Sequence, residues 1–442
     1  MGEFLTNLLA FIVAISVLVA IHEYGHYIVG RWAGMKVLRF SIGFGKPIVT
    51  WVRGPDRTEY CISAIPLGGY VRFLDGREGP VDPEDEGRAF NHRPIPARIA
   101  VLFAGPLFNF IFAIFAYWLL SMDGVPALRP AVGEVMPQTY AAEAGLETGD
   151  QIVAIGGTRT DSWQQALMAM FDNMVAEGRI PMTLEDQRGQ QREAVIRVGE
   201  DSARLTEPGL LFDGLGFLPG APPAVLDDPV ENEAAAQAGI RKGDRIVSVD
   251  AKPVLGFVDL VEAVVERPGE RIDLGVVRDG RLENFSLVIG TREVDGQTSG
   301  FLGVRALLDE LGPVQALPRA LSDTWQQTAF TVRMLARMVT GEVSFKNVSG
   351  PINIAQFAGD SAQRGLRYFL GFLAMISISL GVLNLLPVPV LDGGQIVYQT
   401  VEWIKGSPLS ERSQILGQQF GILALILLMS FAFYNDIARI LG

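Results

Sequence analysis

Two histidines and a glutamate stand together in the segment His22-Glu23-Tyr24-Gly25-His26, which has the form HExxH. Residues four apart on a helix face the same side, so both imidazoles can bind one zinc ion. Glu23 lies one residue further round and can take a proton from the attacking water. The chain has only three histidines, and two of them make this motif. The pattern predicts a catalytic zinc site rather than two histidines packed at a helix end.

A catalytic zinc site needs a third protein ligand and one open position. His92 is the remaining histidine, but its surroundings are charged and proline-flanked, and Glu59 falls in an expected strand. Asp392 is the better candidate because an ionisable residue at the end of an apolar span is costly and usually functional. Pro387, Pro389 and two glycines surround it, and unwound backbone at membrane depth is tolerated where it lines a cavity.

The elements that must position these residues are long apolar segments. Four stretches without charged residues each approach the roughly 20 residues that cross a bilayer as a helix: Phe4–Ile21, Ile99–Met122, Tyr368–Leu391 and Ser413–Asn435. The first has Glu3 before it, without the basic start and small-residue cleavage site of a secretory signal. We expect a polytopic α-helical membrane protein with four transmembrane helices, at 1–30, 97–122, 366–391 and 413–437.

Composition and charge agree with a membrane protein. Hydrophobic residues make up 49% of the chain and charged residues only 19%. The net charge of −12 argues against nucleic acid as a partner, which leaves membrane lipid and membrane proteins. A single cysteine, Cys61, excludes an internal disulfide and a multi-cysteine metal site.

Basic residues near the short loops predict the orientation. Arg31, Lys36 and Arg39 follow the first span, and Arg98 precedes the second. Because such residues favour the cytoplasmic side, residues 30–98 should be cytoplasmic. The long region between the second and third spans should then lie outside, in the periplasm of a Gram-negative cell.

Residues 31–96 are expected to form a β-region at the membrane, followed by a charged loop. Apolar and polar positions alternate over 36–73 among several glycines and prolines, which indicates short strands. Strand edges beside a span must be paired or wetted, so this sheet should dip into an aqueous cavity as a re-entrant element.

The middle of the chain contains an internal repeat. The segment AGLETGDQI at 144–152 recurs as AGIRKGDRI at 238–246, and the pattern resembles PDZ domains. We therefore expect two inserted PDZ (α+β) domains, at 127–200 and 205–290. The second copy is expected to include Gly214, Leu215, Gly216 and Phe217, which match the PDZ loop that captures a terminal carboxylate. The alternative is that both domains are packing modules without a ligand. Residues 315–365 should be an amphipathic helix and linker.

Taken together, these motifs resemble the site-2 protease family of intramembrane zinc metalloproteases. The resemblance covers nearly the whole chain. It rests on HExxH in the first span, the segment from Asn384 to Gly393 in the third and the tandem PDZ pattern between them. Further matching segments are Gly43–Gly45, Gly105–Asn109 and Ser349–Ile352.

The resemblance implies roles for individual residues. His22, His26 and Asp392 would hold one zinc ion, and Glu23 would be the general base of a zinc metalloendopeptidase. Asn384 would position the substrate backbone or stabilise the oxyanion.

For three positions a packing role competes with or replaces a catalytic one. A polar packing contact between spans is the competing interpretation for Asn384. Gly105 and Asn109 are expected to serve close packing and hydrogen bonding rather than catalysis.

The resemblance also implies the class of substrate. Substrates would be single-pass proteins of the bacterial inner (plasma) membrane, such as anti-sigma factors, and remnant signal peptides. An unwound substrate helix would add to the sheet around Ser41–Val49, against Gly43, Phe44 and Gly45. The PDZ domains would gate substrates, by excluding bulk or by reading a new C-terminus.

Two functions from other classes compete with proteolysis. A membrane scaffold with a dead metal site would have lost a ligand or Glu23, and all are present. A zinc-dependent transporter would need more polar residues in the second and fourth spans than this chain has.

Overall fold

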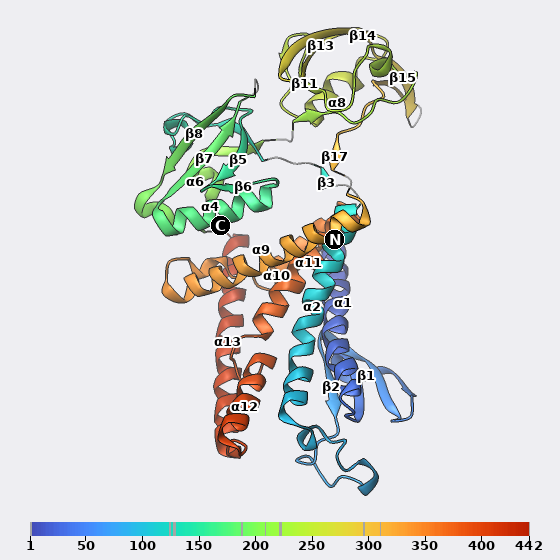
Figure 1. Ribbon diagram of the computed structural model, residues 1–442, viewed down its shortest axis with the longest axis vertical. Helices are drawn as coiled ribbons and strands as arrows, with labels where there is room; N and C mark the ends of the chain where they lie inside the picture. Colours follow the sequence, from blue (N-terminus) through green and yellow to red (C-terminus); the bar gives the residue numbers. More distant parts are fainter. Residues whose placement is uncertain are drawn as a thin grey trace. The chain divides into compact units, whose positions relative to one another are not determined.

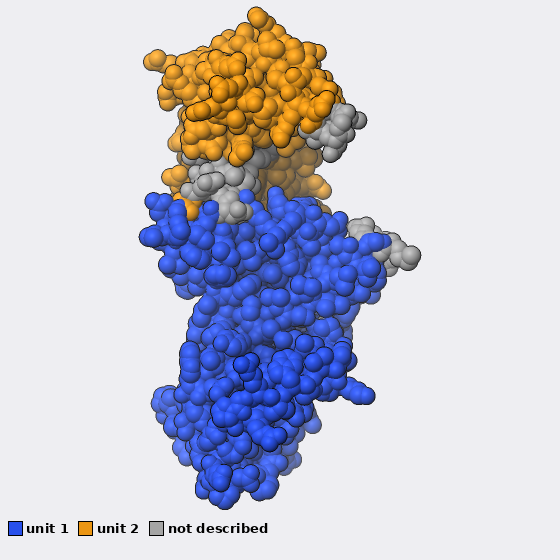
Figure 2. All heavy atoms as spheres, turned by 90° about the vertical axis from the view of Figure 1, so that its right-hand side faces the viewer, with its two compact units in different colours: residues 1–122, 312–335, 348–442 blue, residues 123–311, 336–347 orange. Residues whose placement is uncertain are grey.

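The computed structural model describes residues 2–122, 125–126, 130–186, 189–207, 209–220, 223–294, 297–309 and 311–441. The chain divides into two compact units, coloured separately in Figure 2. The first unit comprises residues 1–122, 312–335 and 348–442, and the second comprises residues 123–311 and 336–347.

The first unit is a bundle of long helices. Among the described residues, four helices have the length and apolar composition to cross a membrane (Figure 1): α1 (Gly2–Trp32), α2 (Ile95–Met122), α11 (Leu366–Asn384) and α13 (Glu411–Leu441). The four predicted spans are therefore helical. The third ends earlier than its expected limit of 391, because Pro387 and Pro389 lack the backbone N–H and follow a tight turn. The chain resumes as α12 (Asp392–Lys405), whose first residue is Asp392.

Small residues bring α1, α2 and α11 close together. A Cβ added at Gly25 of α1 would lie 2.4 Å from the carbonyl oxygen of Ala104 in α2. A Cβ at Gly381 of α11 would lie 3.1 Å from the Phe110 ring. Since lipid provides little hydrophobic drive between helices, such close packing is what holds membrane helices together. It also brings the HExxH face of α1 against α2.

A further pair of helices follows the second unit in sequence. The expected amphipathic helix is α9 (Pro313–Thr340), which buries Ala316 and Ala320 and exposes Trp325. After it comes α10 (Pro351–Gln363). The carboxylate of Asp436 in α13 accepts hydrogen bonds from three backbone N–H groups at the start of α10: those of Gly350, Ile352 and Asn353. This contact satisfies donors that a helix start leaves unpaired.

The expected β-region consists of two long strands, β1 (Val37–Arg53) and β2 (Thr58–Phe73). Both bend at irregular positions, so that Val37–Ile42 pairs with Gly69–Phe73 on one side and with Glu59–Ile62 on the other. Gly43 has φ +92°, and a Cβ there would lie 2.9 Å from two carbonyl oxygens of β2. The bend leaves Gly69–Phe73 as an outer strand beside α1.

The second unit contains two larger sheets, each with a helix and a core of its own. The first has the order β8-β7-β5-β4-β9, with β6 beside β5. Its strands are β4 (Ala131–Val135), β5 (Gln151–Ile155), β6 (Thr158–Arg159), β7 (Arg179–Glu185), β8 (Gln191–Arg197) and β9 (Phe217–Gly220). Helices α3 (Tyr140–Glu143), α4 (Trp163–Glu177), α5 (Ser202–Leu205) and α6 (Leu210–Leu215) accompany it.

The second sheet has the order β10-β11-β13-β14, with β12 beside β11. Its strands are β10 (Ala224–Val225), β11 (Arg245–Val249), β12 (Lys252–Pro253), β13 (Arg271–Arg278) and β14 (Arg281–Val288). Helices α7 (Ala234–Gln237) and α8 (Phe257–Val265) and the hairpin of β15 (Gly290–Val294) and β16 (Gln297–Phe301) complete it. A short pair, β3 (Val125–Pro126) and β17 (Leu308–Asp309), joins the ends of this region.

The structure corrects the assignment of Gly214, Leu215, Gly216 and Phe217 to the second repeat. Phe217 begins β9, which pairs with β4 and so belongs to the first sheet. The second sheet has an equivalent segment later in the chain, Leu302-Gly303-Val304. Gly216 and Gly303 share positive φ (+83° and +77°), and each carbonyl accepts a backbone hydrogen bond, from Met136 and Val230 respectively. In each repeat this loop comes near the end of the sequence of its domain and not at the beginning, so the loop before the second repeat belongs to the first.

Candidate metal centre

Three potential metal ligands converge in the first unit. His22 and His26 lie one turn apart on α1, and Asp392 opens α12. Asp392 Oδ2 lies 3.1 Å from His22 Nε2 and 3.5 Å from His26 Nε2, and the two Nε2 atoms are 3.2 Å apart. The structure thus brings together the three residues that the sequence analysis named as ligands.

These separations suit one zinc ion. Ligand atoms about 2.0–2.1 Å from a tetrahedral ion lie about 3.3 Å from one another. All three observed separations fall close to that value. His92 and Glu59, the alternatives considered from sequence, lie elsewhere: Glu59 pairs with Arg39 at 2.6 Å, and His92 lies beside Gly76.

The outer nitrogens of both imidazoles face polar groups of α2. His26 Nδ1 lies 2.7 Å from the carbonyl oxygen of Val101. A carbonyl can only accept, so Nδ1 carries the proton, and in the neutral ring Nε2 presents a lone pair. His22 Nδ1 lies 3.2 Å from Nδ2 of the fully buried Asn109, whose amide oxygen has no hydrogen-bond partner on the other side within the described residues. With the Asn109 oxygen turned toward the ring, it accepts the Nδ1 proton in the same way.

The donor set therefore fits a cation. Both Nε2 atoms and Asp392 Oδ2 present electron pairs to one point, and Oδ2 is buried without a hydrogen-bond donor. Unpaired acceptors facing one another in a buried site are costly unless a positive charge lies between them. The side chains of His22, His26 and Asp392 would hold that ion.

Glycines make room for this arrangement. A Cβ at Gly105 of α2 would lie 2.3 Å from His26 Nε2 and 2.8 Å from His22 Cε1. Glycines 393 and 394 allow the preceding loop to fold onto the start of α12, where added Cβ atoms would lie 2.3 and 2.1 Å from its carbonyl oxygens. Gln395 also holds that loop, donating to the Pro389 carbonyl at 2.8 Å.

Glu23 lies between the ligand group and the outer strand of the β-region. Its side chain is only 9% exposed. A Cβ at Gly69 would lie 3.0 Å from Glu23 Cγ, and the backbone of Val71 also lies near its carboxylate. The strand segment closest to Glu23 is thus Gly69–Val71.

The sequence analysis did not identify this segment. Gly43, Phe44 and Gly45 lie on the neighbouring strand, and Phe44 stacks on Tyr70 with ring centroids 6.3 Å apart. The Gly68-Gly69 pair is the signal that could have found it, since paired glycines in a strand often mark close approach by another chain. Val101 and Asn109, the partners of the imidazoles, were also not assigned to the metal site.

Two other groups of predicted residues make no contact with the ligand atoms among the described hydrogen bonds and ion pairs. Asn384 ends α11 with a half-buried side chain, and within the described residues that side chain makes no hydrogen bond. Gly214, Leu215, Gly216 and Phe217 belong to the second compact unit.

Comparisons with known proteins extend over this whole arrangement. The profile of peptidase family M50 matches residues 10–428. The chain is 41% identical to the regulator of sigma E protease of Salmonella typhi and 40% identical to the regulator of sigma-E protease RseP of Escherichia coli K12, with 100% of both chains covered in each case. It is 40% identical to a putative zinc metalloprotease of Neisseria meningitidis serogroup A, over 99% of this chain and 100% of the relative.

Gly105→Ala should greatly weaken metal binding, because the new methyl group would occupy the space of both imidazoles. The measurement is zinc content and affinity of the purified protein by chelator competition. The control is Gly371→Ala in α11, where the added Cβ would make an ordinary contact of 3.7 Å with Leu120. Equal zinc affinity in both variants would contradict the role given to Gly105.

Asn109→Ala should lower zinc affinity by about 10–100-fold, because His22 loses the group that orients its ring. The control is Ser377→Ala, which removes a buried hydrogen bond of 2.9 Å to the Asn109 backbone carbonyl and leaves the amide side chain in place. If the Ser377 variant loses as much affinity as the Asn109 variant, the loss reflects packing and not ring orientation.

Proposed function

The chain belongs to peptidase family M50 and is a zinc metalloprotease, and from this premise we propose that it cleaves single-pass membrane proteins within their transmembrane segments. The convergence of His22, His26 and Asp392 beside Glu23 carries the proposal. These residues lie on or next to helices with the length and composition of membrane spans. A scaffold or a transporter has no need of a glutamate beside a three-ligand metal site.

The proposed catalysis assigns His22, His26 and Asp392 to one zinc ion and Glu23 to proton transfer. Bound zinc supplies Lewis acidity, which lowers the pKa of water and polarises the scissile carbonyl. Glu23 takes the proton of the attacking water and delivers it to the leaving amine. Its small exposure keeps bulk water from competing for that proton.

We assign the substrate-binding edge to Gly69–Val71. A transmembrane helix hides its carbonyl groups, so a substrate must unwind before cleavage. Unwound backbone in a membrane needs hydrogen-bond partners, and an outer strand provides them. This assignment replaces Ser41–Val49, because Gly69 and Val71 are the residues that approach Glu23.

Asn384 is proposed to act on the substrate and not on the metal. It ends α11 at the turn that leads to Asp392, and its amide has unused hydrogen-bonding capacity among the described contacts. An amide there is suited to hold the substrate backbone or the oxyanion of the intermediate.

The two sheets of the second unit are proposed to be PDZ domains of the permuted kind, each ending in its own loop. The loops are Leu215-Gly216-Phe217 and Leu302-Gly303-Val304. We propose that these domains lie in the periplasm and gate substrates, while Arg31, Lys36 and Arg98 mark the cytoplasmic side of the inner membrane. Relatives named for regulating sigma E support anti-sigma factors as substrates.

The proposed activity is tested with a single-pass substrate that has a short outer tail, in detergent. We expect wild type to cleave it, and both a chelator and Glu23→Gln to abolish cleavage. Loss of the general base should slow the reaction by about 10²–10⁴-fold, so that no product is detected in the time wild type needs for cleavage, while zinc content is unchanged. If both proteins carry zinc and neither cleaves any short-tailed substrate, the scaffold function is favoured. Cleavage that survives Glu23→Gln would disprove this mechanism.

Val71→Pro should lower kcat/KM by about 10–100-fold, because it removes an N–H from the proposed binding edge. Val71→Thr is the matched control, since it keeps the N–H and a β-branched side chain. Zinc affinity, measured on both, should stay at the wild-type value. The edge assignment fails if the proline variant cleaves as fast as the threonine variant.

A further inference from the structure

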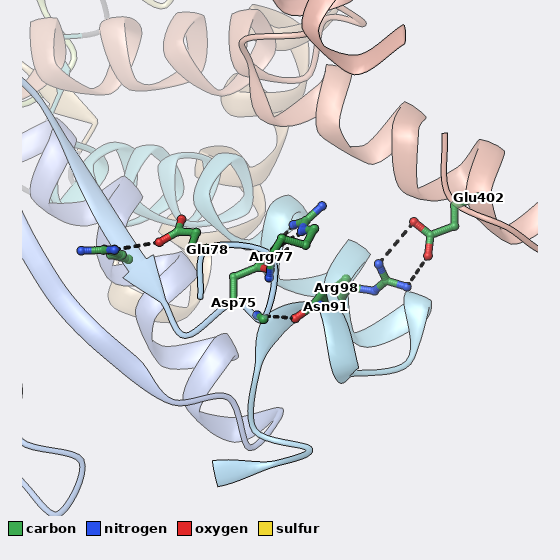
Figure 3. A network of polar contacts seen from close by, with 8 residues as sticks. Asp75, Arg77, Glu78, Asn91, Arg98 and Glu402 are labelled. Atoms are coloured by element: carbon green, nitrogen blue, oxygen red, sulfur yellow. Dashed lines mark hydrogen bonds and ion pairs between the residues drawn. The ribbon is translucent and has the colours of Figure 1, made fainter. Parts of the chain in front are cut away.

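A buried ion pair joins α2 to α12 outside the metal centre. Arg98 Nη2 donates to Glu402 Oε1 at 2.8 Å, and Nη1 lies 3.4 Å from Oε2 (Figure 3). The side chains are only 8% and 19% exposed. Removing two charges from water costs several kcal/mol per ion, so such a pair adds little net stability. The ion pair instead restrains how α12 is placed against α2.

The two ends of the pair belong to the two helices that build the metal centre. Glu402 lies in the last turn of α12, the helix that begins with Asp392. At about 1.5 Å per residue, the two carboxylates lie about 15 Å apart along the same rigid element. α12 packs against α2, so the pair reinforces an existing helix contact at the end opposite the ligand.

Arg98 lies on the face of α2 that contacts the metal ligands. Successive steps of three, four and four residues lead from Arg98 to Val101, Gly105 and Asn109, which places all four on one helical face. Val101 and Asn109 hold the imidazoles, and Gly105 leaves room for them. One face of α2 thus touches the two histidines directly and the aspartate helix through Glu402.

A loop carries a second cation, Arg77, near the same carboxylate. Arg77 is fixed by Asp75, with Nη2 2.6 Å from Oδ2, and the loop is closed by a hydrogen bond from the Gly76 N–H to Asn91 (Figure 3). The pKa of Arg77 is raised, first by this bond with Asp75 and further by the charge of Glu402. Arg98 therefore makes the hydrogen bonds to Glu402, and Arg77 adds only a longer-range attraction.

We propose that Arg98 and Glu402 are positioning residues for the metal centre. Their ion pair fixes α12 against α2 and thereby sets Asp392 at the separations from His22 and His26 that one ion requires. The inference rests on the proposed assignment of these three residues as zinc ligands. The metal centre then depends on residues outside the ligand set, since the ion pair lies about three helical turns from Asp392 along α12.

The test measures metal binding in the Glu23→Gln background, so that it does not depend on protease activity. Zinc affinity is obtained by chelator competition, and the visible spectrum of the Co²⁺-loaded protein reports ligand geometry. Glu402→Gln and Arg98→Gln should each weaken zinc binding by about tenfold or more and alter the Co²⁺ bands. Glu78→Gln is the control, because it breaks a nearby ion pair with Arg72 that is more than half exposed on both sides and should leave both readouts unchanged.

If the single variants do not fold, the double variant Arg98→Glu/Glu402→Arg, in which the two charges are exchanged, provides the test. Recovery of zinc affinity and of the Co²⁺ spectrum in the double variant supports the positioning role. Wild-type affinity and spectrum in the two single variants would overturn it, as would a folded double variant that recovers neither. Absence of zinc binding in the Glu23→Gln parent would instead refute the proposed metal site itself.

Discussion

Three electron-rich atoms meet in a place where charge is expensive, and most of the first unit follows from that constraint. His22 Nε2, His26 Nε2 and Asp392 Oδ2 lie 3.1–3.5 Å apart among helices that have the composition of membrane spans. Without a cation they would repel one another, and without fixed partners they would rotate apart. The carbonyl of Val101 and the amide of Asn109 remove that freedom. The glycines at the helix contacts then let the backbones approach closely enough for these bonds to form.

The same constraint explains why the third apolar segment is broken. The helix α11 ends at Asn384, and Asp392 begins a separate helix, α12. Two prolines end α11, and two glycines permit the following loop to lie on the first turn of α12. A carboxylate at a helix start also benefits from the positive end of the helix dipole. The break is therefore part of how a residue distant in sequence reaches the site.

Prediction from the sequence named the three side chains that converge, because residue type and local spacing carry that information. HExxH and the isolated Asp392 can be recognised as candidate site residues because histidine and aspartate are costly at membrane depth. It failed where a backbone group or a long-range pairing decides. The carbonyl of Val101 has no signature in a sequence, and the outer position of Gly69–Val71 depends on how β1 and β2 bend. The loop at Gly214–Phe217 was assigned to the wrong repeat because strand pairing, and not adjacency along the chain, determines its sheet.

One face of α2 carries the residues that contact both imidazoles and α12. Arg98, Val101, Gly105 and Asn109 recur with helical spacing on α2, yet they differ in chemistry, and no pattern of apolar residues would group them. Their partners lie on two other helices: Glu402 on α12, and His22 and His26 on α1. The proposed ligands lie on α1 and α12, and the groups that contact the two imidazoles lie on α2. A zinc site assembled from distant segments needs such a common frame, because two ligand helices held only by the ion would have no fixed arrangement before it binds.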